Sequence, residues 1–332
     1  MCAESFNSTM DAVADRLAAA GSILTVTHAH PDGDAMGSMA ALARSAQGAG
    51  KRACMLVADD LSPRYDFLTE DLRTAKVAEF AAAAGAADII AIVDTCTWSQ
   101  LEGLAGPIAA MREKVLVIDH HSTRDDVGSD QWIDASAAAA GVMVGELLQR
   151  LGWPIDRRVA EALCIALTTD TGWLRFSSTD GRCLRLMADW LEKGVAIDEL
   201  YRRIFQTDRI ERLRLMAWVL AGLELHCGGR LAVMGVRQED FRRTGARPDE
   251  TENLINEALR VATVTAAIML VEQADGTIRT SLRSRGAVDV ARLAQAFGGG
   301  GHARAAGCRS DMPFDEFRRK LIEAFVAAMP LA

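Results

Sequence analysis

The chain has 332 residues, half of them apolar and a quarter charged, so it is long enough for two hydrophobic cores. Its net charge of −8 disfavours long duplex DNA as a partner, because DNA binding requires a continuous basic face. No apolar run reaches the roughly 18 residues of a membrane span, no signal peptide is recognisable, and the seven scattered cysteines form no Cys-x-x-Cys pair, so we expect a cytoplasmic protein without a membrane partner.

Short aliphatic strands alternate with helical segments over the first 120 residues. Runs of aliphatic residues predict strands at 23–27, 53–57, 88–93 and 115–118. Ala-rich stretches between them predict helices, for example at 34–49. This alternation is typical of an α/β fold with a doubly wound, mostly parallel sheet and helices on both faces.

The pattern changes after residue 135. Helices are predicted at 136–151, 157–169, 180–193, 196–205 and 208–221. An α+β pattern follows, with strands at 231–236, 265–271 and 278–284 and helices at 248–260, 288–296 and 313–328. We therefore expect a larger domain over 1–206, a helical linker over 207–222 and a smaller C-terminal α+β domain over 223–332.

Residues that can bind metal ions or take part in catalysis gather where the predicted strands end. The stretch 28–38, HAHPDGDAMGS, directly follows the first strand. Asp94 follows the third strand, and Asp119, His120 and His121 follow the fourth. The carboxyl ends of parallel strands meet at one edge of a sheet, where open α/β sheets bind their ligands. Closely spaced carboxylates repel each other unless a proton or a cation neutralises them, so this edge is a candidate metal site.

Nine side chains are available as metal ligands. They are His28, His30, Asp32, Asp34, Asp94, Asp119, His120, His121 and Asp170. Mixed carboxylate and imidazole ligands suit Mn²⁺, Fe²⁺ or Zn²⁺. Nine donors exceed the needs of one ion, whereas two ions about 3.5–4 Å apart that share a carboxylate would use them. The alternative for each cluster taken alone is a capped polar turn or a solvated loop. We expect His30 to point away from the site, and Gly33 and Gly37 to let alternate carboxylates face two ions.

Taken together, these motifs resemble the DHH phosphoesterase superfamily, which is named after the triplet at 119–121. The resemblance also covers the stretch 28–38, Asp94 with its preceding strand, and 169–172 (TDTG). Near the C-terminus, 281–284 (SLRS) and 297–307 (FGGGGHARAAG) resemble the substrate-binding DHHA1 domain. The ordered matches extend from residue 28 to residue 307.

The resemblance implies a role for individual residues. One ion would be held by His28, Asp32 and Asp94, and the other by Asp34, Asp94, His120 and Asp170. Asp94, His120 and His121 would be catalytic, with His121 near the substrate phosphate as a donor and Asp119 supporting the site. The substrate would be bound by Arg283, Ser284, Gly299, Gly300, Gly301 and His302. The glycine run would let backbone N–H groups approach a phosphate closely.

Within the superfamily the chain is similar to the soluble, two-domain NrnA-like group. The resemblance implies hydrolysis of short RNA and of linear dinucleotides such as pApA and pGpG, and removal of the 3′-phosphate of phosphoadenosine phosphate. It also implies two Mn²⁺ ions, with Mg²⁺ or another divalent ion as the alternative, and a homodimer as an option. A RecJ-like single-strand-specific DNA exonuclease is the alternative enzyme. A catalytically silent nucleotide-binding protein is disfavoured because every expected ligand position is filled.

Overall fold

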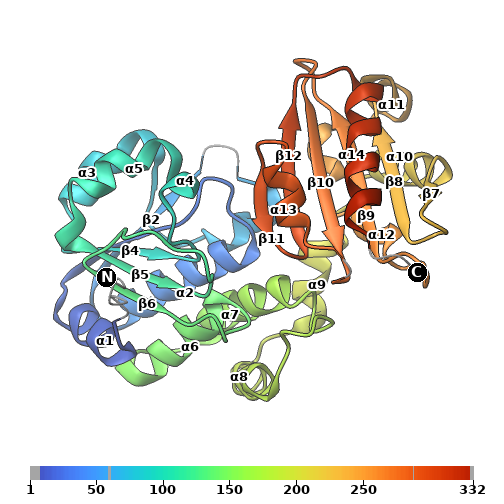
Figure 1. Cartoon of the computed structure of the whole chain (residues 1–332). Coiled ribbons are helices and arrows are strands. Elements are labelled where there is room, and N and C mark those ends of the chain that lie inside the picture. Colours follow the sequence, from blue (N-terminus) through green and yellow to red (C-terminus); the bar gives the residue numbers. More distant parts are fainter. Residues whose placement is uncertain (1–7, 59–60, 287, 330–332) are drawn as a thin grey trace. The chain divides into compact units, whose positions relative to one another are not determined.

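The fold consists of two compact units, which divide between Thr207 and Asp208 in the computed structural model (Figure 1). The structure describes residues 8–58, 61–286 and 288–329. Each unit is built on a sheet of six strands. None of the helices within these described ranges is long and apolar enough to cross a membrane.

The sheet of the first unit is wholly parallel, with the strand order β3-β2-β1-β4-β5-β6. Its strands are β1 Ser22–Val26, β2 Arg52–Val57, β3 Thr74–Lys76, β4 Ile89–Val93, β5 Val115–Asp119 and β6 Asp130–Ile133. The predicted doubly wound α/β architecture is therefore confirmed. The aliphatic runs predicted four of these strands, whereas the short edge strands β3 and β6 have no such run and were missed.

Helices cover both faces of this sheet, so its central strands are buried on both sides (Figure 1). The helices are α1 Met10–Ala19, α2 Gly33–Gly48, α3 Phe80–Gly85, α4 Trp98–Leu101, α5 Ala105–Ala109, α6 Ala140–Leu151, α7 Arg157–Asp170, α8 Gly181–Leu191 and α9 Ile197–Phe205. Side chains of α1, α2, α6 and α7 form one core with alternate strand residues such as Ile89 and Ala91. Ile90 and Ile92 point to the other face and pack with α3, α4 and α5.

The second unit is an α+β structure on a mixed sheet with the order β11-β12-β10-β9-β8-β7. Its strands are β7 Glu224–His226, β8 Leu231–Val236, β9 Ala266–Glu272, β10 Ile278–Ser284, β11 Gly300–His302 and β12 Ala305–Ser310. Its helices are α10 Ile210–Ala221, α11 Gln238–Thr244, α12 Ile255–Ala258, α13 Val290–Gln295 and α14 Phe314–Ala328. Only β8 and β9 pair in parallel; the other neighbours are antiparallel. Short 3₁₀ helices complete the chain at Pro63–Leu68, Val77–Glu79, Glu102–Leu104, Arg112–Lys114 and Pro248–Thr251.

The segment expected as a linker corresponds to α10. Leu215 and Val219 of this helix are buried in a core of the second unit, together with side chains of α11, α12, β8 and β9. The other face of the second sheet packs against α13 and α14. β9 and β10 form an antiparallel hairpin, and its turn contains Gly276 at φ +84°, a left-handed conformation that glycine adopts without strain.

Candidate metal centre

The turn between β1 and α2 ends in a helix cap made by one of the predicted ligands. Oδ1 of Asp32 accepts the backbone N–H of Asp34 at 2.9 Å and that of Ala35 at 3.1 Å. This N-cap satisfies two of the amides that a helix start leaves without a partner. The cap uses Oδ1 only. The cap and the ligand role proposed for Asp32 are therefore compatible.

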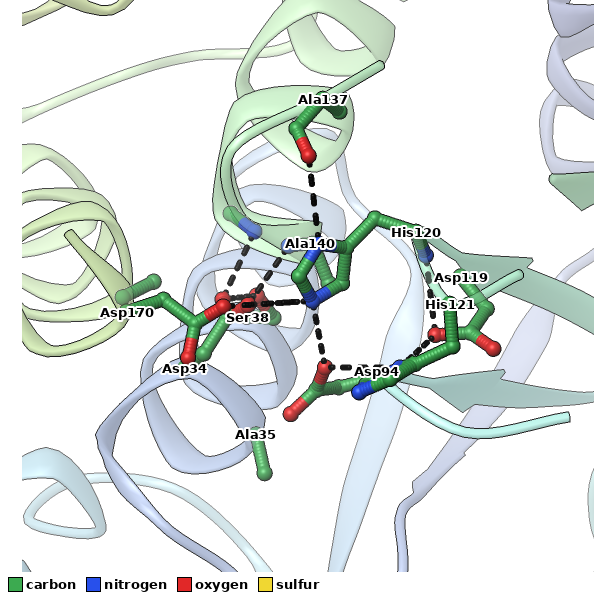
Figure 2. A network of polar contacts seen from close by, with 12 residues as sticks. Asp34, Ala35, Ser38, Asp94, Asp119, His120, His121, Ala137, Ala140 and Asp170 are labelled. Carbon is green, nitrogen blue, oxygen red and sulfur yellow. Dashed lines mark hydrogen bonds and ion pairs between the residues drawn. The ribbon is translucent and has the colours of Figure 1, made fainter. Parts of the chain in front are cut away.

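Asp34 is fully buried in the first turn of α2, where three donors hold its carboxylate (Figure 2). Its oxygens accept the N–H groups of Ala140 at 2.6 Å and Gly141 at 2.8 Å, and the hydroxyl of Ser38 at 3.1 Å. Burial raises its pKa well above the ordinary value, and the negative charges of Asp94 and Asp170 raise it further. A positive charge close to Asp34 would stabilise its ionised carboxylate.

Three glycines bring α2, α6 and α7 unusually close together. A Cβ atom at Gly37 would lie 2.4 Å from the backbone oxygen of Ala162, and one at Gly141 would lie 2.3 Å from Cβ of Ala166. At Gly33 a Cβ atom would lie 2.3 Å from the side chain of Thr169. Gly33 and Gly37 therefore allow close helix packing. The expected role of the two glycines in directing alternate carboxylates to two ions stays a prediction.

Asp94 lies at the end of β4, between two imidazoles. Its backbone has φ +61°, a left-handed conformation that Asp tolerates better than most residues, and its N–H donates to the carbonyl of Ile118 at 3.0 Å. One carboxylate oxygen lies 3.5 Å from Nε2 of His28, and the other lies 3.3 Å from Nε2 of His120. Asp94 is thus placed to connect the two sides of the site.

His120 presents one ring nitrogen to three carboxylates (Figure 2). Its Nδ1 lies 3.2 Å from the carbonyl oxygen of Ala137, which can only accept, so Nδ1 carries a proton. Nε2 lies 3.3 Å from Asp94 and from Asp170, and 3.7 Å from Asp34. Within the described part of the chain, Nε2 of His120 and Oδ1 of Asp94 are buried without a hydrogen-bond partner. A cation between these atoms would satisfy both.

The pKa values of this cluster show that it attracts positive charge. Burial lowers the pKa of His120, but the close contact with the charged Asp94 and the charges of nearby carboxylates outweigh it and raise the value to about 10. Burial, with the charge of Asp94 next, raises the pKa of Asp170 to about 7. For Asp94 the close imidazoles of His120 and His28 outweigh burial and lower the pKa to about 2. Protons held at such a site are readily replaced by metal ions.

The donor atoms form two groups that follow the split implied by the resemblance, except that Asp94 is absent from the second group. One group is His28, Asp32 and Asp94, and the other is Asp34, His120 and Asp170; in each, the ligand atoms lie within 4.8 Å of one another. A third group of the same kind contains Asp94, His120 and His121. The structure therefore brings all six predicted ligands together. His30 lies outside these groups, with its side chain 78% exposed and 3.6 Å from Glu102.

His121 is held by Asp119 beside this cluster. The carboxylate Oδ1 of Asp119 lies 2.7 Å from Nδ1 of His121 and accepts the backbone N–H of His120 at 2.9 Å. Burial lowers the pKa of His121, but the hydrogen bond and charge of Asp119 outweigh it and the pKa is raised. Asp119 therefore orients the imidazole and favours its protonated form.

Sequence reasoning missed the contribution of the segment before α6. The predicted helix over 136–151 begins only at Ala140, because Oδ1 of Asp134 accepts the N–H and the hydroxyl of Ser136 and forms a turn. This turn places the carbonyl of Ala137 against His120 and directs the first amides of α6 at Asp34. The Asp-x-Ser pattern was the available signal, but the Ala-rich composition favoured a helix.

In the second unit, the structure separates the residues predicted to bind substrate. Arg283 lies on one face of β10, and its guanidinium donates to the carbonyl of Leu282 at 3.1 Å. Ser284 lies on the opposite, buried face, where its hydroxyl accepts the N–H groups of Gly286 and Val288. Its side chain supports this loop and lies on the other side of the sheet from Arg283, and a substrate contact of Ser284 stays a prediction.

The glycine run forms a helix end and a strand. The N–H of Gly299 donates to the carbonyl of Ala294, and a Cβ atom at Gly299 would lie 2.1 Å from the oxygen of Gly307. Gly301 has φ +133°, and Gly300 pairs with Gly307 and has open space at its Cβ position. The amide of Gly299 is therefore occupied, which removes it from the expected anion site. His302 pairs with Ala305 through the backbone, and its side chain lies outside the described residues.

Comparison with known proteins gives two family matches. Residues 22–167 match the DHH family, N-terminal domain, and residues 228–328 match the DHHA1 domain. The chain is 32% identical over 92% of its length to the bifunctional oligoribonuclease and PAP phosphatase NrnA of Thermus thermophilus, of which it covers 89%. It is 26% identical over 71% of its length to the protein of the same name from Bacillus subtilis, of which it covers 74%.

Solved structures show the same fold. An exopolyphosphatase-related protein from Bacteroides fragilis matches with a TM-score of 0.88 and 26% identity, over 96% of this chain and 94% of that one. Exonuclease RecJ bound to manganese matches with a TM-score of 0.54 and 15% identity, over 99% of this chain and 97% of that one. The second likeness concerns the fold alone.

Proposed function

We propose that this chain, which belongs to the DHH family and carries a DHHA1 domain, uses two divalent cations to hydrolyse short oligoribonucleotides and linear dinucleotides of the pApA and pGpG type to mononucleotides. Phosphoester hydrolysis is the shared activity of the family, and its relatives are named as oligoribonucleases and phosphatases. Removal of the 3′-phosphate from phosphoadenosine phosphate is the second reaction that we propose for the same site. The observation that carries the proposal is the pair of donor groups that meet at Asp94 and His120.

The donor set fits divalent cations of intermediate softness. Each group combines one imidazole with carboxylates. This mixture suits Mn²⁺ better than Mg²⁺, because Mg²⁺ prefers ligands that are all oxygen. The buried Nε2 of His120 and Oδ1 of Asp94 have no hydrogen-bond partner in the described residues, so a cation there would replace a missing interaction. We therefore propose Mn²⁺ as the preferred ion, with His28, Asp32 and Asp94 on one side of the site and the second donor group on the other.

Two cations bound in this way would lower the pKa of a water molecule and neutralise charge on the phosphoryl oxygens. Residues of the chain would hold the metal ligands in place and exchange protons with the substrate. His121, oriented by Asp119, would donate a proton to the leaving oxygen of the phosphoester bond. Ser38 and the first amides of α6 would keep Asp34 in place during the reaction. Burial of these groups strengthens each electrostatic contact.

We propose that Arg283 binds a substrate phosphate. Burial lowers its pKa, and no carboxylate of the described residues lies within ion-pair distance of its guanidinium. A partly buried arginine without a carboxylate partner is costly, and a phosphate would neutralise it through charge-assisted hydrogen bonds. Gly300 leaves open space on the strand next to β12 and would allow a ligand to approach the backbone.

A substrate panel tests this function. Metal-free protein supplied with Mn²⁺ would be incubated with pApA, pGpG, pentaadenylate, phosphoadenosine phosphate and a long single-stranded DNA, and the products would be separated by chromatography. We expect mononucleotides from the dinucleotides and pentaadenylate, and none of this turnover with Asp94→Asn. No turnover of the short RNAs and dinucleotides by metal-loaded protein would refute the proposal. Faster hydrolysis of the long DNA would favour the exonuclease alternative.

A further inference from the structure

On one face of the second sheet, the half formed by β10 and β12 contributes no residue to the apolar core that the described residues of this unit form there; we call it the uncovered half-face. On this face, the apolar residues of β8 and β9 pack with α10, α11 and α12, and the core ends at β9. The next strand, β10, directs Arg279, Ser281 and Arg283 to the same face, because alternate residues of a strand share a side. All three are only partly buried. The uncovered half-face is therefore polar and carries arginines.

Two of these arginines face each other across neighbouring strands. The antiparallel register of β10 and β12 places Arg279 directly opposite Arg309. Like charges in this position repel each other and destabilise a sheet. Burial lowers the pKa of Arg279, and the charge of Arg309 lowers it further. The repulsion between Arg279 and Arg309 therefore lowers the stability of the sheet.

The surrounding described residues do not neutralise this pair. Arg279 donates to the hydroxyl of Thr251 at 2.7 Å, and no carboxylate of the described chain lies within 4 Å of either guanidinium. Glu252 and Asp275 contribute charge from a greater distance. Three other arginines of this unit do lie close to a carboxylate, namely Arg237 with Asp315, Arg260 with Glu257 and Arg318 with Glu224. What distinguishes Arg279 and Arg309 is that two arginines without a close carboxylate in the described residues lie directly opposite each other on neighbouring strands.

We propose that Arg279 and Arg309 form a second phosphate-binding subsite, which holds a phosphodiester of an oligoribonucleotide longer than a dinucleotide. This inference rests on the proposed function, because it adds a second phosphate contact to the one that we propose for Arg283. Arg283 and Arg279 are four residues apart on one face of β10, a distance of about 13 Å along the strand. The subsite therefore binds a phosphate farther along the same nucleotide chain. Thr251 holds the guanidinium of Arg279 toward it.

Binding of labelled pentaadenylate to the metal-free full chain, followed by fluorescence anisotropy, tests the subsite directly. We expect Arg309→Gln and Arg279→Gln each to weaken binding about tenfold. Each substitution should also reduce the salt slope of binding by roughly 0.7, the value for one phosphate contact on a single strand. The control Arg260→Gln removes an exposed arginine outside this face and should change neither quantity.

A second measurement separates this subsite from the metal centre. With Mn²⁺ present, kcat/KM for pApA should stay within twofold of the wild type in Arg309→Gln, while kcat/KM for pentaadenylate should fall about tenfold. Relief of the repulsion should leave the Tm of this variant equal to or above that of the wild type. If pApA is hydrolysed but the variant loses nothing on pentaadenylate, the subsite is refuted and the proposed function stands.

Three other outcomes would overturn the subsite. In the first, the wild type fails to bind pentaadenylate. In the second, Arg309→Gln loses kcat/KM equally on pApA and pentaadenylate and has a lowered Tm. In the third, inorganic phosphate inhibits pApA hydrolysis by the wild type but not by Arg309→Gln. The last result would show that the arginines bind free phosphate. Absence of pApA hydrolysis by the metal-loaded wild type would instead refute the proposed function, while the anisotropy result would still judge the subsite.

Discussion

Substitution of Gly37 by alanine should damage both the packing of α2 against α7 and the metal centre. The added Cβ atom would lie 2.4 Å from the oxygen of Ala162 and 2.9 Å from the nitrogen of Ala166. Both are backbone atoms of α7, so no side chain can rotate away. Restoring an ordinary contact of about 3.4 Å requires the helices to separate by about 1 Å, and such overpacking costs about 1–3 kcal/mol of unfolding free energy.

The separation should also reach the site. Asp34 lies one turn before Gly37 on α2, and Asp170 ends α7, so the two ligands would move apart. A misplacement of about 1 Å lowers activity by about 10²-fold. Urea unfolding would measure the stability, and kcat for pApA with Mn²⁺ would measure the activity.

The matched control is Gly85→Ala. A Cβ atom at Gly85 meets nothing within 4 Å, and this glycine has no positive φ. The same chemical change should therefore stabilise the protein by about 0.4–1 kcal/mol through the unfolded state and leave kcat unchanged. If Gly37→Ala were as stable and as active as the wild type, the account of glycine-dependent helix packing at the site would be wrong.

Three further predictions concern the groups around the ions. The folded, metal-free chain binds more protons than the unfolded chain, at Asp170 between pH 3.8 and about 7 and at His120 between pH 6.5 and about 10, so its stability should fall as the pH rises through these ranges. Because Mn²⁺ displaces these protons, the increase in Tm that it causes should grow from pH 6 to pH 8 in thermal-shift scans; a constant increase would contradict this. Asp119→Asn should lower kcat about 10- to 100-fold at saturating Mn²⁺, and an unchanged kcat would remove Asp119 from the mechanism. Ser38→Ala should weaken Mn²⁺ binding about tenfold in calorimetry, since Asp34 loses one of its three donors; unaltered affinity would show that the two amides suffice.

Much of the first unit could be predicted because its signals are local. Aliphatic runs buried on both faces indicate parallel strands, and five of the six predicted ligands follow such strands in the sequence, whereas Asp170 ends α7. The supporting contacts depend on tertiary packing. The turn at Asp134 was hidden by an Ala-rich segment with high helix propensity, and the role of Gly37 became visible only when α7 lay against it.

The second unit was less predictable, because the motif predicted to bind substrate carries two kinds of residue. Within SLRS, Arg283 and Ser284 are adjacent, and neighbours on a strand point to opposite faces, so one motif supplies both a partly buried cation and a buried loop support. The pairing of Arg279 with Arg309 requires the strand register, which sequence spacing does not give.

The central claim is that two cations at one site carry out the hydrolysis, and a stoichiometric titration tests it most directly. Metal-free protein at a concentration far above the dissociation constant would be titrated with Mn²⁺ while the release of AMP from pApA is followed. The account predicts that activity reaches its maximum at two ions per chain, and that Asp94→Asn, which alters the carboxylate between His28 and His120, abolishes it. Full activity without a divalent ion, or a maximum at one ion per chain, would contradict the account.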